Sequence, residues 1–243
     1  VIGRLLEAEG YRVCIVPQPD WHGDYRDFRK LGRPRLFFGI APGCMDSMVN
    51  KYTANRRLRS EDAYSPDGRH DMRPEYPTIV YSRILKELYP DVPVVLGGIE
   101  ASLRRVTHYD YWKERLMPCI LADSGADLII YGMGELPLVD LCKTIDQHLL
   151  HGREESFCSA EQFNGLMRKY PVRQTVTLQQ KEDIFGGIKE DDIQLYSHED
   201  CLVNKRHYAE NFRHIEEESN RLHPQRILQQ LGNKYVVVNP PYP

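Results

Sequence analysis

Along the first 150 residues, short runs of apolar residues alternate with stretches whose apolar positions are spaced three and four apart. The apolar runs predict buried strands at Tyr11–Val16, Leu36–Ile40, Val92–Leu96 and Asp127–Tyr131. The amphipathic stretches predict helices over residues 1–9, residues 24–31, Thr78–Tyr89 and Leu138–Leu149. Alternation of such strands with helices is typical of a parallel sheet covered on both faces. We therefore predict an α/β fold with a doubly wound, mostly parallel sheet of the Rossmann type.

Beyond residue 150 the alternation is weaker. Val172–Leu178 has the composition of one more strand, and a polar, acidic stretch with two adjacent glycines follows it. Lys205–Asn220 has the spacing of a charged helix, and Val236–Asn239 reads as a last short strand. The sequence thus predicts a Rossmann-like domain over residues 1–150, a linker or excursion over residues 151–200, and a smaller helical extension over residues 201–243.

The turns that follow the predicted strands are the candidate site, because doubly wound sheets bind ligands beyond the carboxyl ends of their strands. In the turn after Leu36–Ile40, Gly43 permits a tight bend. Asp46 or Ser47 can cap the next helix and leave backbone N–H groups facing the gap. The ordinary interpretation, a strand–turn–helix joint with no ligand, stays open because such caps are common.

The turn after Val92–Leu96 begins with Gly97 and Gly98, which allow close approach of a ligand to the backbone. Four polar side chains follow the two glycines: Glu100, Ser102, Arg104 and Arg105. We expect Glu100 and Ser102 at the mouth of a crevice, and we expect the two arginines to bind a carboxylate or phosphate. A structural turn explains the two glycines equally well.

The turn after Asp127–Tyr131 repeats this pattern with Gly132, Gly134 and Glu135. An acidic side chain at a helix start is favourable on structural grounds alone. Glycine turns after neighbouring strands nevertheless outline one glycine-walled crevice, so we predict that all of these turns bind one cofactor or ligand.

Two further segments carry candidate contact residues. His108–Trp112 (HYDYW) concentrates aromatic side chains on a predicted loop, either as a lid that stacks on a ring system or as an anchor for that loop. Lys51–Arg73 carries six cationic and four acidic side chains, which suits anion or partner binding or simply a solvated loop.

Composition narrows the classes of function. The net charge of -3 does not favour nucleic-acid binding, and no apolar run is long enough for a membrane span, so we expect a cytoplasmic protein. The six cysteines are scattered without a CxxC or CxxxCxxC motif, which predicts packed, reduced thiols rather than a metal site. No GxSxG or GxxxxGK[ST] motif is present. The chain opens inside a predicted helix without an initiator Met, which suggests a truncated start.

Several strings resemble one bacterial family, the YgiQ-type radical SAM proteins, in their N-terminal region. The most specific are GGIEASLRR at residues 97–105 and HYDYW at residues 108–112. The others include GCMDSM at residues 43–48, NKYTA at residues 50–54, GMGE at residues 132–135 and VNPP at residues 238–241. The resemblance is dense to about residue 150 and sparser afterwards.

This resemblance implies that a further stretch precedes the chain and that a radical SAM barrel follows it. The CxxxCxxC of that barrel would supply three thiolates to a 4Fe–4S cluster, and S-adenosylmethionine would bind the open iron. None of the cysteines of this chain is assigned to the cluster. The fragment alone is then expected not to be an enzyme, while the parent protein is expected to be a radical SAM enzyme of unknown substrate.

The glycine turns are also similar to those of cobalamin-binding domains of other radical SAM enzymes. The DxHxxG motif that supplies the cobalt ligand is absent, because in Asp20–Gly23 (DWHG) the glycine directly follows His22. If cobalamin binds, it would do so without a cobalt-ligating histidine from this chain.

Three classes of function follow. The leading hypothesis is an accessory domain whose glycine turns form a ligand crevice against the downstream barrel. The alternative is a module that docks protein or substrate and holds no small ligand. A self-sufficient transferase or hydrolase is disfavoured, since no nucleophile–base motif is visible.

Overall fold

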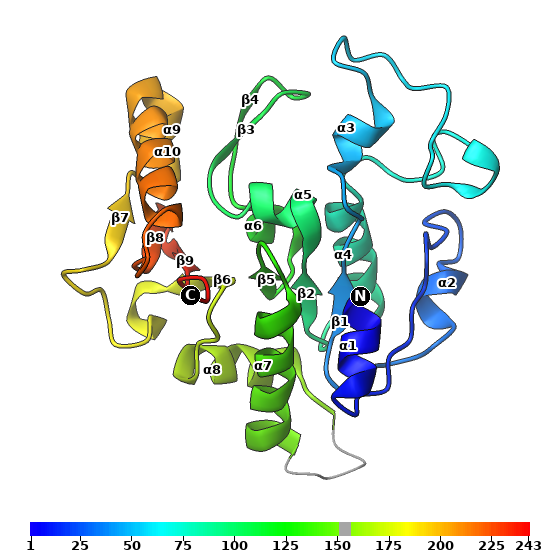
Figure 1. The fold of residues 1–243 in the computed structure, drawn as a ribbon, viewed down its shortest axis with the longest axis horizontal. Coiled ribbons are helices and arrows are strands. Elements are labelled where there is room, and N and C mark those ends of the chain that lie inside the picture. Colours follow the sequence, from blue (N-terminus) through cyan, green and yellow to red (C-terminus); the bar gives the residue numbers. More distant parts are fainter. Residues whose placement is uncertain (151–156) are drawn as a thin grey trace.

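In the computed structural model, residues 1–150 and 157–243 are described, and they form one seven-stranded sheet with helices on both faces (Figure 1). A separate two-stranded hairpin projects at the top of the view. The order across the sheet is β1 (Phe38–Ile40), β2 (Val94–Leu96), β5 (Leu128–Ile130), β6 (Thr175–Gln180), β9 (Lys234–Val238), β8 (Ile227–Leu231) and β7 (Ile193–Leu195). The predicted α/β class and doubly wound architecture are confirmed.

The sheet combines a parallel and an antiparallel part. Strands β1, β2 and β5 are parallel neighbours, whereas β6, β9 and β8 pair antiparallel and β7 is parallel to β8. The β8–β9 hairpin turns at Gly232 and Asn233, and Gly232 has φ +57°, as a tight two-residue turn between strands requires. Two reversals of direction separate β5 from β9, so both strands end at the same edge of the sheet.

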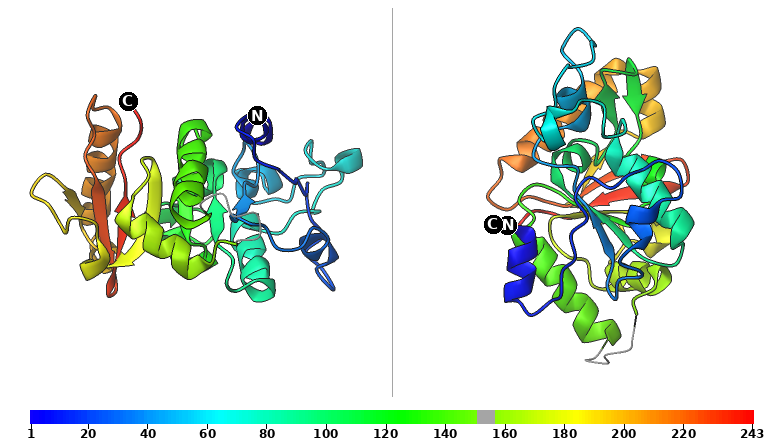
Figure 2. Two further views of the ribbon diagram at one scale, coloured as in Figure 1. Left: turned by 90° about the horizontal axis from the view of Figure 1, so that it is seen from below. Right: turned by 90° about the vertical axis from the view of Figure 1, so that its right-hand side faces the viewer.

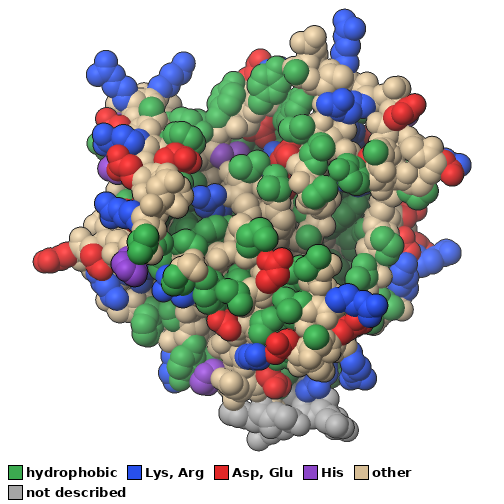
Figure 3. Space-filling model, viewed as in Figure 1, with side chains coloured by type: hydrophobic (Ala, Val, Ile, Leu, Met, Phe, Trp, Pro, Cys, Tyr) green, Lys and Arg blue, Asp and Glu red, His purple; other side chains and the backbone are tan. Residues whose placement is uncertain are grey.

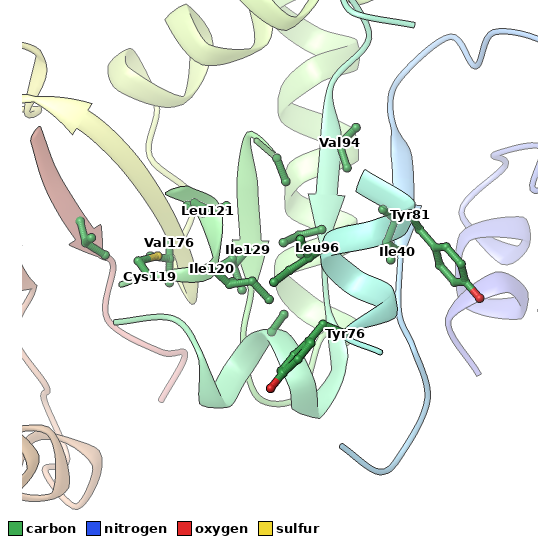
Figure 4. Packing of buried hydrophobic residues seen from close by; sticks show 14 of the residues in the cluster. Ile40, Tyr76, Tyr81, Val94, Leu96, Cys119, Ile120, Leu121, Ile129 and Val176 are labelled. Carbon is green, nitrogen blue, oxygen red and sulfur yellow. The ribbon is translucent and has the colours of Figure 1, made fainter. Parts of the chain in front are cut away.

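Two hydrophobic clusters cover the two faces of the sheet (Figure 2). Successive strand residues alternate between them: Val94, Leu96 and Ile129 lie in one cluster, and Val95 and Leu128 in the other. The first face packs against α4 (Pro77–Leu88) and α6 (Ile120–Ser124), and Figure 4 shows their side chains meeting those of the strands. The second face packs against α1 (Ile2–Ala8), α7 (Glu135–Ile145) and α8 (Ala160–Lys169).

The remaining elements lie at the ends of strands or along the edges of the sheet. Their bounds are α2 (Arg26–Arg29), α3 (Ser47–Lys51), α5 (Gly98–Leu103), α9 (His198–Val203), α10 (Lys205–Ser219), β3 (His108–Asp110) and β4 (Arg115–Met117). Within the described part of the chain, every helix is too short or too polar to span a bilayer.

Two sequence-based predictions of local structure are wrong. Tyr11–Val16 is not a strand, since no strand pairs with it and Ile15 is 74% exposed. The HYDYW segment is not a loop, because His108–Asp110 forms β3 and pairs with β4 in a hairpin.

The expected division at residues 150 and 200 stays a prediction. The sheet runs through all three expected ranges, because β6, from the expected linker, pairs with both β5 and β9. Residues 151–156, with which that linker begins, lie outside the described residues.

Helix α7 offers a test of the second hydrophobic cluster. Leu141 is fully buried there, whereas Leu136 on the same helix is 61% exposed. We expect Leu141→Ala to lower the free energy of unfolding by about 3 kcal/mol, as buried leucine truncations do. Leu136→Ala, the matched control, should change it by less than about 0.5 kcal/mol in urea titrations. Equal effects of the two substitutions would contradict this packing.

Candidate functional site

The glycine turns after β1, β2 and β5 meet at one edge of the sheet, called here the rim. Gly98 has φ +81°, and a Cβ atom placed on it would come within 3.3 Å of the carbonyl oxygen of Gly43. Between the next two turns, the backbone N–H of Gly132 donates to Ser102 Oγ at 3.1 Å. Ser102 Oγ in turn donates to the carbonyl oxygen of Gly98 at 2.8 Å. The rim therefore brings together the three predicted turns in direct contact.

Glu100 does not stand at the mouth of a crevice, as the sequence suggested, because its side chain is fully buried. Its Oε1 accepts a hydrogen bond from the backbone N–H of Thr78 at 3.1 Å, at the start of α4. Its Oε2 accepts from the hydroxyl of Ser47 and from the backbone N–H of Ser47, at the start of α3. The carboxylate thereby links α5 to the N-termini of two other helices, where negative charge is favourable.

Arg104 also serves the fold rather than an open site. It is 8% exposed and forms an ion pair with Asp46, which is equally buried. Asp46 caps α3 by accepting from the backbone N–H of Met48 at 3.1 Å. Burial alone would lower the pKa of the Arg104 guanidinium, but the hydrogen bond and charge of Asp46 raise it above its usual value. The Nη1 of Arg104 bonds to Asp46 and to the carbonyl oxygen of Glu100, while its buried Nε has no hydrogen-bond partner among the described residues.

Arg105 is different, because no carboxylate lies within ion-pair distance of it among the described residues. Its Nη1 donates to the carbonyl oxygen of Ser102 at 2.7 Å, and its guanidinium lies 5.1 Å from the centre of the Tyr131 ring. Burial lowers the pKa of Arg105, while Tyr131 and Glu216 act in the opposite direction. Of the two arginines expected to bind an anion, Arg104 is paired with a carboxylate and Arg105 has no acidic partner on the described chain.

The remaining predicted residues frame the third turn. Gly134 precedes α7 as its N-cap residue, and Glu135 lies in the first turn of that helix. Gly97 donates its backbone N–H to the carbonyl oxygen of Ile40 at 2.8 Å and so continues the β1–β2 pairing. Their contribution to ligand binding stays a prediction.

The side chains that the rim exposes are mostly apolar, which sequence reasoning missed. The exposed set consists of Met45, Ile99, Leu103, Met133 and Leu136, and we call it the apolar rim surface. Its members are 39–76% exposed and belong to the three turns or to the helices that follow them. Figure 3 shows hydrophobic side chains gathered over the middle of this face, around α5 and the start of α7. In the sequence, an apolar residue adjoins the glycines of each turn, and this pattern could have indicated an exposed apolar surface.

The C-terminal residues lie against the same rim. The hydroxyl of Tyr131 donates to the carbonyl oxygen of Asn239 at 2.7 Å, and the hydroxyl of Tyr242 bonds to Asp140 of α7. The backbone N–H of Gln174 donates to the carbonyl oxygen of Pro240 at 2.9 Å. The chain thus leaves the sheet beside the turn between β5 and α7.

The HYDYW hairpin is tied down by its neighbours. Asp110 accepts hydrogen bonds from the hydroxyl of Tyr76 at 2.7 Å and from the backbone N–H of Trp112 at 2.9 Å. Tyr111 donates to the carbonyl oxygen of Ala54 at 2.8 Å, which joins the hairpin to the loop of residues 51–73. These contacts favour the anchor interpretation over a mobile lid.

Charges in the 51–73 loop are largely paired. Arg73 bonds Asp62 within the loop at 2.9 Å, and Lys51 bonds Asp71 at 2.6 Å. Arg56 reaches Glu114 of the hairpin at 2.6 Å. This pairing favours a structural role for the loop over an anion site.

The cysteines do not fit an iron–sulfur cluster. Among residues 1–150 and 157–243, no three His, Cys, Asp or Glu side chains are grouped so that they could hold a metal ion. Burial raises the pKa of the Cys119, Cys142 and Cys158 thiols to about 12, so each stays protonated. His22 is an exposed surface side chain, and its Nδ1 lies 3.1 Å from Oδ1 of Asp20.

The sequence model described as "Radical SAM N-terminal" matches residues 1–243. The chain belongs to this family.

Similar proteins from several bacteria carry the name UPF0313 protein. The one from Bacteroides thetaiotaomicron is 62% identical over the whole chain, and the one from Porphyromonas gingivalis is 60% identical. A third, from Geobacter sulfurreducens, is 41% identical over 245 residues. The chain spans only 36–38% of the length of these relatives. No solved structure matches the chain.

The Asp46–Arg104 ion pair gives the first prediction for this family member's rim. Arg104→Met leaves the buried Asp46 carboxylate unpaired, so we expect the free energy of unfolding to fall by about 3–5 kcal/mol. The double variant Asp46→Asn/Arg104→Met removes the unpaired charge and keeps a capping side chain, and it should cost less than Arg104→Met alone. Arg4→Met, at an ion pair in which Arg4 is 91% exposed, is the control and should cost less than about 0.5 kcal/mol. If the cost of the double variant equals the sum of the costs of Asp46→Asn and Arg104→Met, the two side chains are not coupled.

Acid should destabilise the fold through His108. Burial lowers the pKa of this imidazole from 6.5 to about 4, so the unfolded state binds more protons between these values. Stability should therefore fall as the pH drops from about 6.5 to about 4. His198, whose pKa burial also lowers, adds to the same trend. Urea midpoints measured across this range should decline less steeply for His108→Gln than for the wild type, while exposed His223→Gln should follow the wild type. An unchanged slope for His108→Gln would refute this origin.

Proposed function

We propose that this chain is the N-terminal accessory domain of a radical SAM 4Fe–4S enzyme, and that its apolar rim surface packs against the remaining part of the longer protein. The observation that carries the proposal is the apolar rim surface itself, with five large exposed side chains at the carboxyl ends of three adjacent strands. A monomeric surface seldom gathers so many large apolar side chains unless they mark an interaction site. Their burial would supply the driving force for docking.

The course of the chain supports this occupant. The relatives are more than twice as long as the stretch that this chain matches. The last residues here lie against the end of β5 and against α7, where Tyr131 and Asp140 bond to them. A segment that continues from Pro243 would therefore start beside the apolar rim surface.

The proposal assigns the chemistry to the part of the protein beyond this chain. In it, a 4Fe–4S cluster and S-adenosylmethionine are held by the barrel, since the described cysteines do not fit a cluster. Glu100 and Asp46 hold the rim together, because their carboxylates accept hydrogen bonds from the starts of α3 and α4. Arg104 adds an ion pair with Asp46. The substrate is not specified by these residues.

A ligand at the same rim is the finer part of the proposal. Arg105 keeps donors without an acid partner among the described residues, and beside it the glycine turns leave backbone accessible. An anionic group of a ligand, or a carboxylate of the barrel, would complete the hydrogen bonding of Arg105. Cobalamin in the crevice stays a prediction without a cobalt ligand from this chain.

A chimera tests the docking. This chain replaces the matched region of the Bacteroides thetaiotaomicron relative, and amide hydrogen exchange is compared with that of the isolated chain. We expect residues 98–104 and 131–137 to exchange at least about tenfold more slowly in the chimera, because the interface covers them. Leu103→Asp and Met133→Asp should abolish that protection. Leu31→Asp, at an exposed side chain that precedes β1, should not. Equal exchange in chimera and isolated chain would overturn the proposal.

The same chimera separates ligand binding from docking. Arg105→Glu with retained protection of the rim, but with weaker binding of hydroxocobalamin, S-adenosylmethionine or ATP, would support a ligand site at Arg105. Loss of the protection alone would place a carboxylate of the barrel there instead. If none of the three compounds binds the unsubstituted chimera saturably, the ligand half of the proposal is wrong.

A further inference from the structure

A pocket of about 520 Å³ opens at the edge of the sheet opposite the rim. It is enclosed by the end of α6, by α8, by the end of β6 and by the β8–β9 hairpin. The volume lies within the range of small-molecule sites, roughly 300–1,000 Å³. The pocket shares no residue with the rim and belongs to a different part of the fold.

The pocket exists because β6 extends past β5. Only Thr175 and Val176 pair with β5, whereas residues 176–180 pair with β9 on the other side. Residues 177–180 therefore present an unpaired strand edge towards α6 and α8. Thr177 and Gln179 on this edge line the pocket.

The hydrogen bonding of Gln179 is the observation that indicates a ligand. The side chain is 8% exposed, and its Nε2 donates to Thr177 Oγ1 at 2.6 Å. Its Oε1 is buried and has no hydrogen-bond partner among the described residues. Exchanging the amide oxygen and nitrogen does not remove the problem, because one end of the amide then stays an unused donor. Buried polar atoms normally have partners, so an atom from outside the chain, of a ligand or a water, would complete the hydrogen bonding of Gln179.

The terminal torsion of a glutamine is broad, so the amide of Gln179 can turn towards the pocket without leaving a favoured rotamer. The hydroxyl of Thr177 accepts from Gln179 and donates to none of the described residues. Together the two side chains offer a donor and an acceptor on one wall.

Charge at the mouth favours an anion. Lys234 is exposed and has no acidic partner among the described residues, whereas Arg168 bonds Asp183 at 3.2 Å. Asp127, the acidic residue of the lining, is neutralised by Lys86 and also accepts from Asn164 at 2.9 Å. The free cation is thus Lys234, at the start of β9.

The lining also includes the apolar residues Leu121, Met167, Leu178 and Leu231, beside the polar Asp127, Asn164 and Arg168. We infer that this pocket binds a small molecule that carries one anionic group, a carboxylate or a phosphate, on an apolar body. Lys234 binds the anionic group, the amide of Gln179 binds a polar atom of the ligand, and the apolar walls cover its body. The site is independent of the docking proposed for the rim.

Two aryl anions test the site on the 243-residue chain, with amide chemical shifts as the readout. Benzoate and phenyl phosphate represent the two sources of the anionic group, and benzyl alcohol is the uncharged control. We expect saturable shifts at residues 125–127 and 177–179 with at least one anion, and at least about fivefold weaker binding of benzyl alcohol. The stronger of the two anions identifies the anionic group.

Variants decide whether those shifts report the proposed contacts. Lys234→Gln should weaken binding of the anion by about fivefold, whereas Lys205→Gln, at an exposed lysine outside the pocket, should leave it unchanged. Gln179→Leu should weaken binding by about fivefold while the melting temperature stays equal or rises, because an unpartnered buried amide is removed. Since Lys234 is exposed, its variant decides the outcome even if Gln179→Leu folds poorly. The inference is overturned if no probe shifts the pocket amides saturably, or if Lys234→Gln and Lys205→Gln bind alike.

Discussion

The arrangement of the rim depends on one buried carboxylate, that of Glu100. Its two oxygens accept hydrogen bonds at the starts of α3 and α4, and its own helix α5 follows β2. A buried charge is tolerable only with such partners, and helix N-termini supply partial positive charge as well as donors. The ion pair of Asp46 with Arg104 adds a second link between α3 and α5. Through these bonds, the turns after β1 and β2 hold a fixed position relative to each other.

Because these polar groups bond within the protein, the rim is better described as an apolar interaction surface than as a ligand crevice. A crevice built to bind ligand would leave its charged side chains partly unpartnered, as happens with Arg105. Glu100, Asp46 and Arg104 instead bond to the protein, and the side chains that face outwards are the apolar ones. Family membership and the greater length of the relatives fit the same view, in which the surface is one half of an interface within a longer chain.

The sequence was informative where burial leaves a continuous pattern. β2 and β5 were predictable because both faces of each strand are covered, so every position is apolar. β1 kept an apolar run as well, although Gly39 in its middle is exposed. The meeting of three glycine turns at one edge followed from the parallel order of those strands. Tyr11–Val16 shows the limit of this reasoning, since this apolar run has no neighbouring strand to pair with and forms no strand. Helix α5 was missed because it has only six residues and begins with a glycine.

Partners of individual charges were beyond sequence reasoning. Asp46 and Arg104 are 58 positions apart, and no local pattern distinguishes this paired arginine from its neighbour Arg105. Helical spacing did place the buried Leu138, Leu141 and Ile145 on one face and left out Leu136, which is exposed. The most direct test of the central claim is an experimental structure of a full-length UPF0313 protein. We predict that side chains equivalent to Ile99, Leu103 and Met133 are buried against the part of the protein that follows this domain. A structure in which they face solvent while that part contacts another face would contradict the claim.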